Sequence, residues 1–315
     1  DTLGMKLSLF FDLNTAPQLP LEATLRMAEE HVVLADALGF DTAWFAEHHF
    51  GHYGQLTSPL HFIARLSGLT QSLKLGTAVL PAPFYNPTRL KEETELVDAL
   101  TGGRLKLGLG FGESGDTRSW EAFGASPVER IEQTRISAAH LADAFTGRLY
   151  IAGGSSTPQW IAESGYGLLL PRVGGTENHL QRLACYRDGL GIHRGQVAAL
   201  RLIYVAPTWQ EARVATQPLI TRLALTEPET GHAQQDLLSH LNVAIGDVDQ
   251  VRALLMHWHQ TLGLDELLCQ IDAPELSHED SLRSLELLGT LIPYASTLPD
   301  SVAPQRKVDK VDKLT

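Results

Sequence analysis

The sequence lacks most of the features that would assign a protein class at once. It has two cysteines in 315 residues, Cys185 and Cys269, and they stand in no CxxC spacing. We expect both to be buried, unpaired thiols in a reducing compartment. No stretch approaches the ~20 consecutive apolar residues of a membrane helix, and no signal peptide is recognisable, so the expected location is the cytoplasm.

Positive charge is also scarce. The chain has 25 lysines and arginines against 37 aspartates and glutamates, a formal net charge of −12 at pH 7. This charge argues against nucleic acid or an anionic membrane as a partner. The motifs of P-loop nucleotide binding, serine hydrolases and HExxH zinc enzymes are absent as well, so nothing in the sequence indicates covalent nucleophilic catalysis.

Apolar segments rich in strand-forming residues alternate with amphipathic helical segments along the chain. Most of the apolar segments are continuous, which is typical of parallel strands buried on both faces. A helical segment such as Pro20–Leu38 ends at Gly39, a residue type favoured just after a helix. The predicted strands are Leu7–Phe11, Thr42–Ala46, Leu73–Leu80, Leu105–Gly110, Leu149–Ala152, Gly167–Leu170, Leu200–Ala206 and Glu266–Ile271.

Eight such strands, each followed by a helix, predict a single (β/α)8 TIM-type barrel of the α/β class. We expect one domain over residues 5–295, with an insertion at Gln217–Asn242 near the seventh strand. Residues 1–4 and 296–315 are expected to be a tag or disordered termini. An open doubly wound sheet is the alternative, but it favours a glycine-rich turn after the first strand, where Asp12-Leu13-Asn14-Thr15 stands.

The second predicted strand leads into Glu47-His48-His49. Barrels of this class place their active sites at the carboxyl ends of the strands, and a histidine there can act as an acid or base near neutral pH. Adjacent residues of an extended segment point in opposite directions, so only one of the two histidines is expected to face the mouth. A zinc site and a packed histidine pair are the alternatives.

The third and fourth predicted strands carry small residues along their length. Gly76 and Ala78 lie in the third strand, where a flat ring could approach the backbone, although tight strand packing explains them equally well. The fourth strand contains Gly108 and Gly110 and runs on through Phe111. This glycine-rich run is similar to a phosphate-binding turn, but no nucleotide fingerprint follows it on a helix.

The fifth predicted strand is followed by a loop of glycine and hydroxyl residues, and then by a helix with a proline near its start. Free backbone amides, hydroxyl groups and the helix dipole together suit a phosphate group. An ordinary helix N-cap needs the same residue types. The candidate residues are Gly153, Gly154, Ser155, Ser156 and Thr157.

Taken together, these segments resemble the bacterial luciferase-like family of flavin-dependent oxidoreductases, from about Met5 to Pro293. The motifs are loose one by one, but their order and spacing follow the family. They are Gly39-Phe40-Asp41-Thr42-Ala43-Trp44 with Glu47-His48-His49-Phe50, Leu75-Gly76-Thr77-Ala78-Val79 with Asn86-Pro87-Thr88-Arg89, Gly103-Arg104-Leu105 with Glu121-Ala122-Phe123-Gly124, and Tyr150-Ile151-Ala152-Gly153 with Trp160 and Gly165-Tyr166-Gly167-Leu168-Leu169-Leu170.

The resemblance implies a monooxygenase that uses reduced FMN and O2 on a small hydrophobic substrate, without a metal. It implies that His48 is the catalytic histidine of the oxygen chemistry. It places Ala78 and Val79 at a non-proline cis peptide that lies against the flavin ring, and the loop from Gly154 to Thr157 around the phosphate.

Two departures from the family pattern bear on the cofactor. Phe111, next to Gly110 in the expected cofactor-binding segment, stands where a phosphate-pairing arginine is common. Weak flavin binding is therefore expected, unless Arg172 or Arg118 replaces that contact. The second departure is Gly153-Gly154, in place of the acidic and hydroxyl residues found in luciferase itself. Separately, the run from residue 123 to residue 150 is short where the family has a mobile segment over the active site; either this protein lacks that segment or its residues are left out of the sequence.

Other functions remain open at this point. A reductase that uses a deazaflavin cofactor and a non-catalytic flavin-binding barrel are the alternatives, and a metal-dependent hydrolase at His48 and His49 is a more distant one. The implied partners are the organic substrate, a flavin reductase that supplies reduced FMN, and a second copy in a homodimer. The aromatic residues expected near the mouth favour a hydrophobic substrate; they are Phe11, Phe50, Phe84 and Tyr85.

Overall fold

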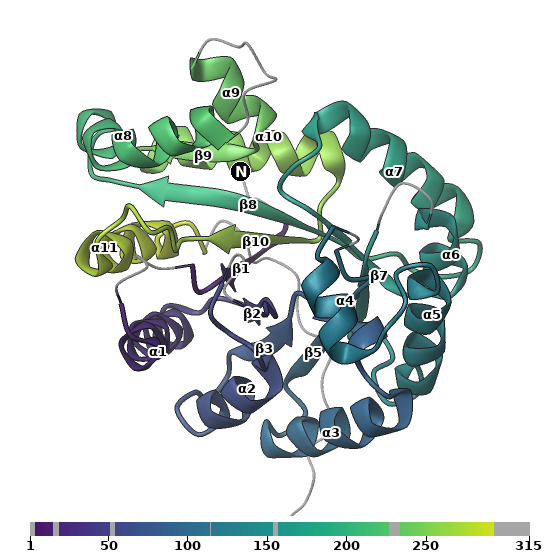
Figure 1. The fold of residues 1–315 in the computed structure, drawn as a ribbon. Coiled ribbons are helices and arrows are strands. Elements are labelled where there is room, and N and C mark those ends of the chain that lie inside the picture. Colours follow the sequence, from purple (N-terminus) through teal and green to yellow (C-terminus); the bar gives the residue numbers. More distant parts are fainter. Residues whose placement is uncertain are drawn as a thin grey trace, which may run out of the picture.

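A closed ring of eight parallel strands forms the centre of the protein, with helices around it (Figure 1). The computed structural model describes residues 4–14, 19–50, 54–113, 115–153, 157–226 and 234–292. Strand β10 pairs with both β1 and β8 and so closes the ring, which confirms the predicted TIM-type barrel. In ring order the strands are β1 Lys6–Phe11, β2 Thr42–Phe45, β3 Lys74–Thr77, β5 Leu105–Gly110, β6 Leu149–Ala152, β7 Gly167–Leu170, β8 Val197–Val205 and β10 Glu266–Gln270.

Two short strands were not predicted. The expected third strand divides, because β3 ends at Thr77 and the two-residue β4, Leu80–Pro81, pairs with β5 beyond it. Strand β9, Val243–Gly246, pairs in parallel with the last part of β8. The segment expected as a polar insertion is largely helical and leads directly into β9. Strand β9 follows a polar segment with little periodicity, so the sequence pattern did not reveal it and pairing with β8 decides this strand.

Most helices pack outside the ring in the order of the chain, whereas α4 lies over the strands (Figure 1). Helix α1 ends at Gly39, which has the expected left-handed backbone with φ 87°, and α10 begins with a capping box of Asp247 and Gln250. The helices are α1 Leu21–Leu38, α2 Pro59–Ser67, α3 Pro87–Leu100, α4 Thr117–Phe123, α5 Arg130–Leu141, α6 Pro158–Glu163, α7 Gly175–Gly189, α8 Trp209–Thr226, α9 Gln234–His240, α10 Val248–Leu262 and α11 His278–Gly289, with a 3-10 turn η1 at Ala82–Phe84.

The barrel has an apolar layer on each face of its wall. Every second residue of a strand points outward against the helices, and the residues between them point into the ring. The inner layer is built around Phe10, Trp44, Tyr150 and Leu268. Continuous hydrophobic strands therefore follow from burial on both faces, as the sequence predicted.

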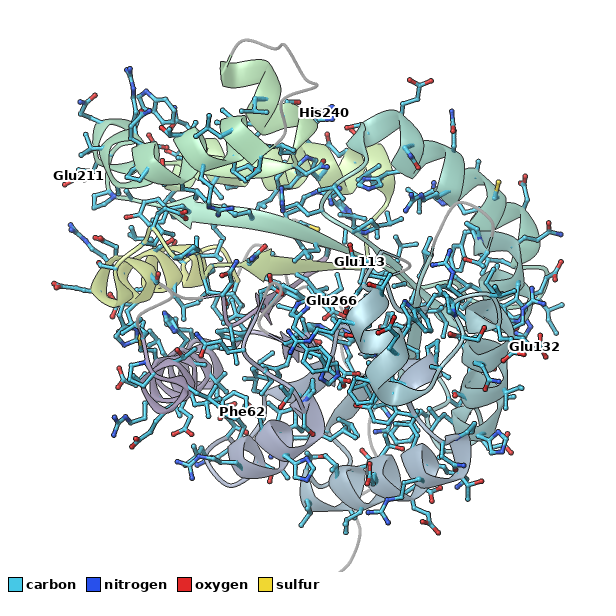
Figure 2. All side chains as sticks on the ribbon, viewed as in Figure 1. Phe62, Glu113, Glu132, Glu211, His240 and Glu266 are labelled. Atoms are coloured by element: carbon cyan, nitrogen blue, oxygen red, sulfur yellow. The ribbon has the colours of Figure 1, made fainter. Side chains whose placement is uncertain are left out.

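A buried ionic cluster lies among the inward-facing side chains near the amino ends of the strands. One oxygen of the Glu266 carboxylate accepts hydrogen bonds from Ser8 Oγ at 2.6 Å and Trp44 Nε1 at 2.8 Å. Its other oxygen lies 2.7 Å from Lys106 Nζ, which also contacts Asp41 at 3.1 Å. Figure 2 shows Glu266 near the middle of the ring. The cluster thus links the closing strand β10 to β1, β2 and β5.

The cysteines only partly match the expectation. Both are unpaired thiols, and Cys269 in β10 is buried, but Cys185 is exposed on α7. The prediction of a second buried thiol was wrong, because the outer side of α7 is turned to solvent at this residue. Among the residues described, no helix is both long enough and apolar enough to cross a bilayer.

We predict that Lys106→Met strongly destabilises the barrel. Burial by itself lowers the pKa of Lys106, but Glu266, Tyr150 and Asp41 outweigh it and hold the pKa above its usual value. Removing the ammonium leaves the Glu266 carboxylate buried without its cation, a change that costs about 3–5 kcal/mol. Urea unfolding at pH 7 measures the loss.

Lys74→Met is the matched control, because Lys74 contacts the same Asp41 at 2.7 Å but is 40% exposed. An exposed pair of this kind contributes ~0–1 kcal/mol. Equal losses in the two variants would contradict the role of the buried cluster.

Candidate functional site

A cavity of about 420 Å³ opens at the carboxyl ends of the strands. Its volume falls within the range of cofactor and small-molecule pockets, ~300–1,000 Å³. Successive strands of the ring contribute to its wall: His48 follows β2, Val79 follows β3, Phe111 follows β5, Gly153 follows β6 and Pro171 follows β7. The cavity therefore lies where barrels of this class hold their active sites.

His48 is held at its backbone, at its ring nitrogen and at its ring edge. Its backbone N–H donates to the carbonyl oxygen of Leu56 at 2.9 Å, and its Nε2 lies 2.5 Å from Asp12 Oδ1. A Cβ atom on Gly54 would lie 2.9 Å from the imidazole Cδ2 and 1.9 Å from the Asp12 carbonyl oxygen. Only a glycine at 54 lets the chain pass this close, so the imidazole has a defined orientation at the cavity wall.

His49 takes a different set of partners. Its Nε2 lies 2.8 Å from Glu47 Oε1, and the Tyr85 hydroxyl donates to Glu47 Oε2. The two histidines have separate acidic partners, but both line the cavity. The expectation that only one of them faces the mouth was therefore wrong. Burial raises the pKa of Glu47, and the hydrogen bonds from His49 and Tyr85 only partly oppose that rise. Burial, with the Glu47 carboxylate, also raises the pKa of Tyr85.

The described residues contain no group of three or more His, Cys, Asp or Glu side chains arranged to hold a metal ion. Within the same residues, the acidic partners of His48 and His49 are separate, Asp12 for one and Glu47 for the other.

The peptide bond between Ala78 and Val79 is cis, the geometry that the resemblance implied at this position. The glycines of β5 make room for Val79. A Cβ on Gly110 would lie 2.4 Å from Val79 Cγ2, and one on Gly108 would lie 3.3 Å from Val79 Cγ1 and 2.3 Å from the Thr77 carbonyl oxygen. Close packing therefore accounts for these glycines. Contact of Ala78, Val79 and Gly110 with a flavin stays a prediction.

The positive charge at the cavity comes from two helices. Arg182 of α7 and Arg130 of α5 line the cavity near Phe111, which carries no charge. Arg182 donates from an NH group to the Gly153 carbonyl oxygen at 3.0 Å, while its Nε is buried and has no hydrogen-bond partner among the described residues. Burial lowers the pKa of Arg182. Arg182 thus brings to the end of β6 a guanidinium group with a buried Nε that is unpaired within the described part of the chain.

The two arginines expected in this role lie elsewhere. Arg118 is placed over the ring of Phe50, 4.3 Å from its centre, and Arg172 donates to the Leu241 carbonyl oxygen at 3.3 Å. Neither lines the cavity. The structure therefore gives no support to either arginine in this role, which stays a prediction.

The predicted phosphate loop is described only at its two ends. Gly153 borders the cavity, and a Cβ there would lie 2.4 Å from Leu168 Cδ1. Thr157 is buried at the start of α6. Gly154, Ser155 and Ser156 lie outside the described residues, so the loop as a phosphate site remains a prediction.

Aromatic rings gather at one side of the mouth. The Phe84 ring is stacked on Phe123 of α4 at 5.0 Å between centres and meets Trp120 edge-on at 4.8 Å. The Phe123 ring also lies 4.6 Å from His49, and Trp120 Nε1 donates to the Glu113 carbonyl oxygen at 2.8 Å. In Figure 1, α4 lies over the strands and inside the circle of outer helices. It covers part of the mouth in a chain whose run between 123 and 150 is short.

One aromatic prediction was wrong. Phe11 is 1% exposed and stacks on Phe45 at 5.2 Å in the layer between strands and helices, away from the mouth. Phe11 is the last residue of β1 and points outward like Leu7 and Leu9, since side chains alternate along a strand (outward and inward parity). This alternation could have been read from the sequence.

The structure adds three site residues that sequence reasoning missed. Asp12 has the inward parity of Ser8 and Phe10, so the period of two indicated that it reaches the mouth. Arg130 and Arg182 gave no such signal, because they lie on helices about fifty residues apart in the chain.

Residues 5–154 match the family model described as luciferase-like monooxygenase. Among curated relatives, Uncharacterized protein y4vJ of Sinorhizobium fredii is 47% identical over 90 residues, 29% of this chain and 26% of the relative. The alkanal monooxygenase alpha chain of the Kryptophanaron alfredi symbiont is 27% identical over 212 residues, 58% of this chain and 59% of the relative. The matched part thus spans about a quarter and about three-fifths of these two relatives.

Solved structures share the fold along nearly the whole chain. Monooxygenase RslO1 from Streptomyces bottropensis has a TM-score of 0.82 at 19% identity and covers 92% of this chain and 99% of its own. The oxygenating constituent of 3,6-diketocamphane monooxygenase from Pseudomonas putida, in complex with FMN, has a TM-score of 0.79 at 15% identity, with 93% and 99% covered. The coenzyme F420-dependent tetrahydromethanopterin reductase of Methanopyrus kandleri has a TM-score of 0.67 at 14% identity, with 92% and 98% covered.

The sequence match covers slightly less than half of the chain, the part that supplies β1 to β6 and includes His48 and the Ala78–Val79 bond. Over residues 5–154 the chain is therefore similar to the luciferase-like monooxygenase family, and its curated relatives include an alkanal monooxygenase alpha chain.

Proposed function

We propose that this protein is a flavin-dependent monooxygenase that uses reduced FMN and O2 to oxygenate a small hydrophobic substrate. The observation that carries the proposal is the composition of one cavity. It combines an oriented histidine, an apolar wall and two arginines at the carboxyl mouth of a luciferase-like barrel.

The residues of the cavity fit the two ends of FMN. Val79, Pro81 and Phe111 offer apolar surface to a flat ring. The unused donor of Arg182 beside Gly153 suits a phosphate, because charge-assisted hydrogen bonds from a guanidinium are among the strongest in proteins. A bound reduced flavin would supply the electrons and the reactivity with O2 that this chain's side chains lack.

His48 is the group best placed to hold or move a proton at the cavity. Asp12 accepts from its Nε2 and so fixes the tautomer and the ring orientation. Phe84, Trp120 and Phe123 cover the neighbouring side of the mouth and limit the access of water. The protein's contribution is therefore to bind, to orient and to supply a proton-transferring imidazole.

A reductase that uses a deazaflavin cofactor is the second candidate, because the F420-dependent reductase of Methanopyrus kandleri shares the fold. Both cofactors carry phosphate, so the arginines suit either. A barrel that binds flavin without catalysis is the third candidate, and the phenylalanine at 111 motivates it.

We also propose a cytoplasmic homodimer that receives reduced FMN from a separate reductase, as the family resemblance implies. Sedimentation velocity measures the dimer. Coupled assays with and without a reductase measure the transfer.

The first prediction concerns the cofactor. In anaerobic titrations followed by flavin fluorescence, we expect saturable binding of reduced FMN at micromolar concentration and weaker binding of oxidised FMN. Preferential binding of the deazaflavin would favour the reductase instead. Absence of binding to any of the three would contradict all flavin-based candidates.

The second prediction concerns Arg182. Arg182→Met should weaken FMN binding about 10–100-fold and leave the binding of riboflavin, which lacks the phosphate, unchanged. Arg118→Met is the control, because Arg118 lies over Phe50 and outside the cavity wall. An equal loss for FMN and riboflavin would show that Arg182 shapes the site without contacting the phosphate.

The third prediction concerns His48. His48→Gln should lower the rate of oxygenated product formation, assayed over a panel of small hydrophobic compounds, by about 100-fold or more. Flavin affinity should stay near the wild-type value. His61→Gln on α2 is the control, since His61 is exposed and bonds to Ser58. Full activity of His48→Gln would overturn the assigned role.

A further inference from the structure

Three neighbouring strands deliver one titratable side chain each to the same part of the mouth. Phe10 pairs with Gln270, and Phe11 pairs with Phe45, so β10, β1 and β2 end side by side. Asp272, Asp12 and His48 follow these strands, each with inward parity. The family resemblance assigned a role only to the last of the three.

Asp272 holds the chain that carries Asp12. Its Oδ2 accepts the backbone N–H of Asp12 at 3.2 Å and that of Leu13 at 2.9 Å. Two successive amides that face one oxygen form a small anion-binding nest. The other oxygen, Oδ1, is buried and has no hydrogen-bond partner among the described residues.

The turn that Asp272 grips is strained. Leu13 has φ 49°, a left-handed backbone that a non-glycine residue rarely adopts, and its side chain is 2% exposed. Such a conformation persists only where surrounding contacts impose it. The hydrogen bond from Leu13 N to Asp272 is one of those contacts, and it acts one residue from the carboxylate that meets His48.

We propose that Asp272 is a positioning residue for His48: it fixes the Asp12–Leu13 turn, and that turn holds the Asp12 carboxylate on the imidazole Nε2. The chemical value of this arrangement rests on the proposed function, in which His48 transfers protons. The arrangement itself can be tested without flavin.

The proton on Asp272 matters because a second carboxylate stands beside it. Burial, with the negative charge of Asp12, raises the pKa of Asp272 to about 7, against the backbone N–H groups of Leu13, Asp272 itself and Asp12, which favour its charged form. Asp12 is the charged neighbour from β1, and His48 is the titratable one from β2. Glu275 on the same loop is paired with Arg222 of α8, and α11 presents the uncharged Ser281.

The sign of the pH effect follows from this raised pKa. Between pH 4 and pH 7 the folded protein keeps the Asp272 proton that the unfolded chain has lost, so stability falls as the pH rises through this window. Above pH 7 the ionised carboxylate adds a second negative charge near Asp12. The hydrogen bond between Asp12 and His48 should therefore respond to pH near 7.

The test compares Asp272→Asn with Asp272→Ala. Protein labelled with ¹⁵N-histidine is examined by NMR for the imidazole Nε2–H that His48 donates to Asp12, identified by its loss in His48→Gln. In the wild type we expect a protected signal that shifts with a midpoint near pH 7. The Asn variant keeps a side-chain oxygen that accepts the backbone N–H groups of Asp12 and Leu13, so the His48 signal should persist. Because an amide does not titrate, the midpoint near pH 7 should disappear. The Ala variant should lose the signal.

Asp36→Asn is the matched control. Asp36 also grips a turn through backbone N–H groups, those of Gln71, Ser72 and Leu73, but it lies at the end of α1, beyond the amino ends of the strands. Its substitution should leave the His48 signal and the midpoint unchanged. A wild-type midpoint that survives in Asp272→Asn, or an intact signal in a folded Asp272→Ala, would overturn the proposal. If the Ala variant fails to fold, the disappearance of the midpoint in the Asn variant still decides.

A kinetic measurement separates this proposal from the proposed function. With an active wild type, Asp272→Ala should lower kcat by up to ~100-fold through a displaced imidazole, with flavin affinity retained, and Asp272→Asn should restore most of it. If the wild type binds no flavin, the proposed function is wrong. The NMR experiment still tests the positioning role of Asp272, because it does not depend on flavin.

Discussion

The Glu266 carboxylate is the contact on which the closed barrel depends most. It takes hydrogen bonds from β1 and β2 and the ammonium of Lys106 from β5, while its own strand β10 completes the ring. Charged groups that are buried away from water are stable only where opposite charges and hydrogen bonds offset the loss of hydration. The ring can therefore close only in the register that brings these partners together, and a one-residue slip of β10 would turn the carboxylate outward.

The residues that stabilise the barrel and the residues that line the cavity lie at opposite ends of the same strands. Near their amino ends, the inward side chains form the buried ionic cluster with the ring of Trp44 above Lys106. Toward the carboxyl ends they give way to the apolar inner layer and then to the cavity. Glu266 at the start of β10 and Asp272 just after its end show this, because both have inward parity and lie six residues apart. One carboxylate closes the barrel, and the other organises its mouth.

The mouth combines the family's pattern with features of this chain. His48 and the cis bond at Ala78–Val79 occupy the expected strand ends. Phe111 is an uncharged part of the wall, and Arg182 brings a positive charge to it from an outer helix. Helices and loops vary more freely than barrel strands, so a lost contact at a strand end can be replaced from outside the ring.

The sequence by itself determined the barrel, because eight hydrophobic runs and their helices carry the periodicity that burial on both faces demands. It also indicated that a histidine lies at the carboxyl end of the second strand, but not that both His48 and His49 line the cavity. Tertiary structure alone decided that β9 forms, that Arg182 and not Arg172 faces the cavity, and that Asp12 meets His48. These contacts join residues distant in the chain, and local patterns hold no information about the angle at which packed elements meet.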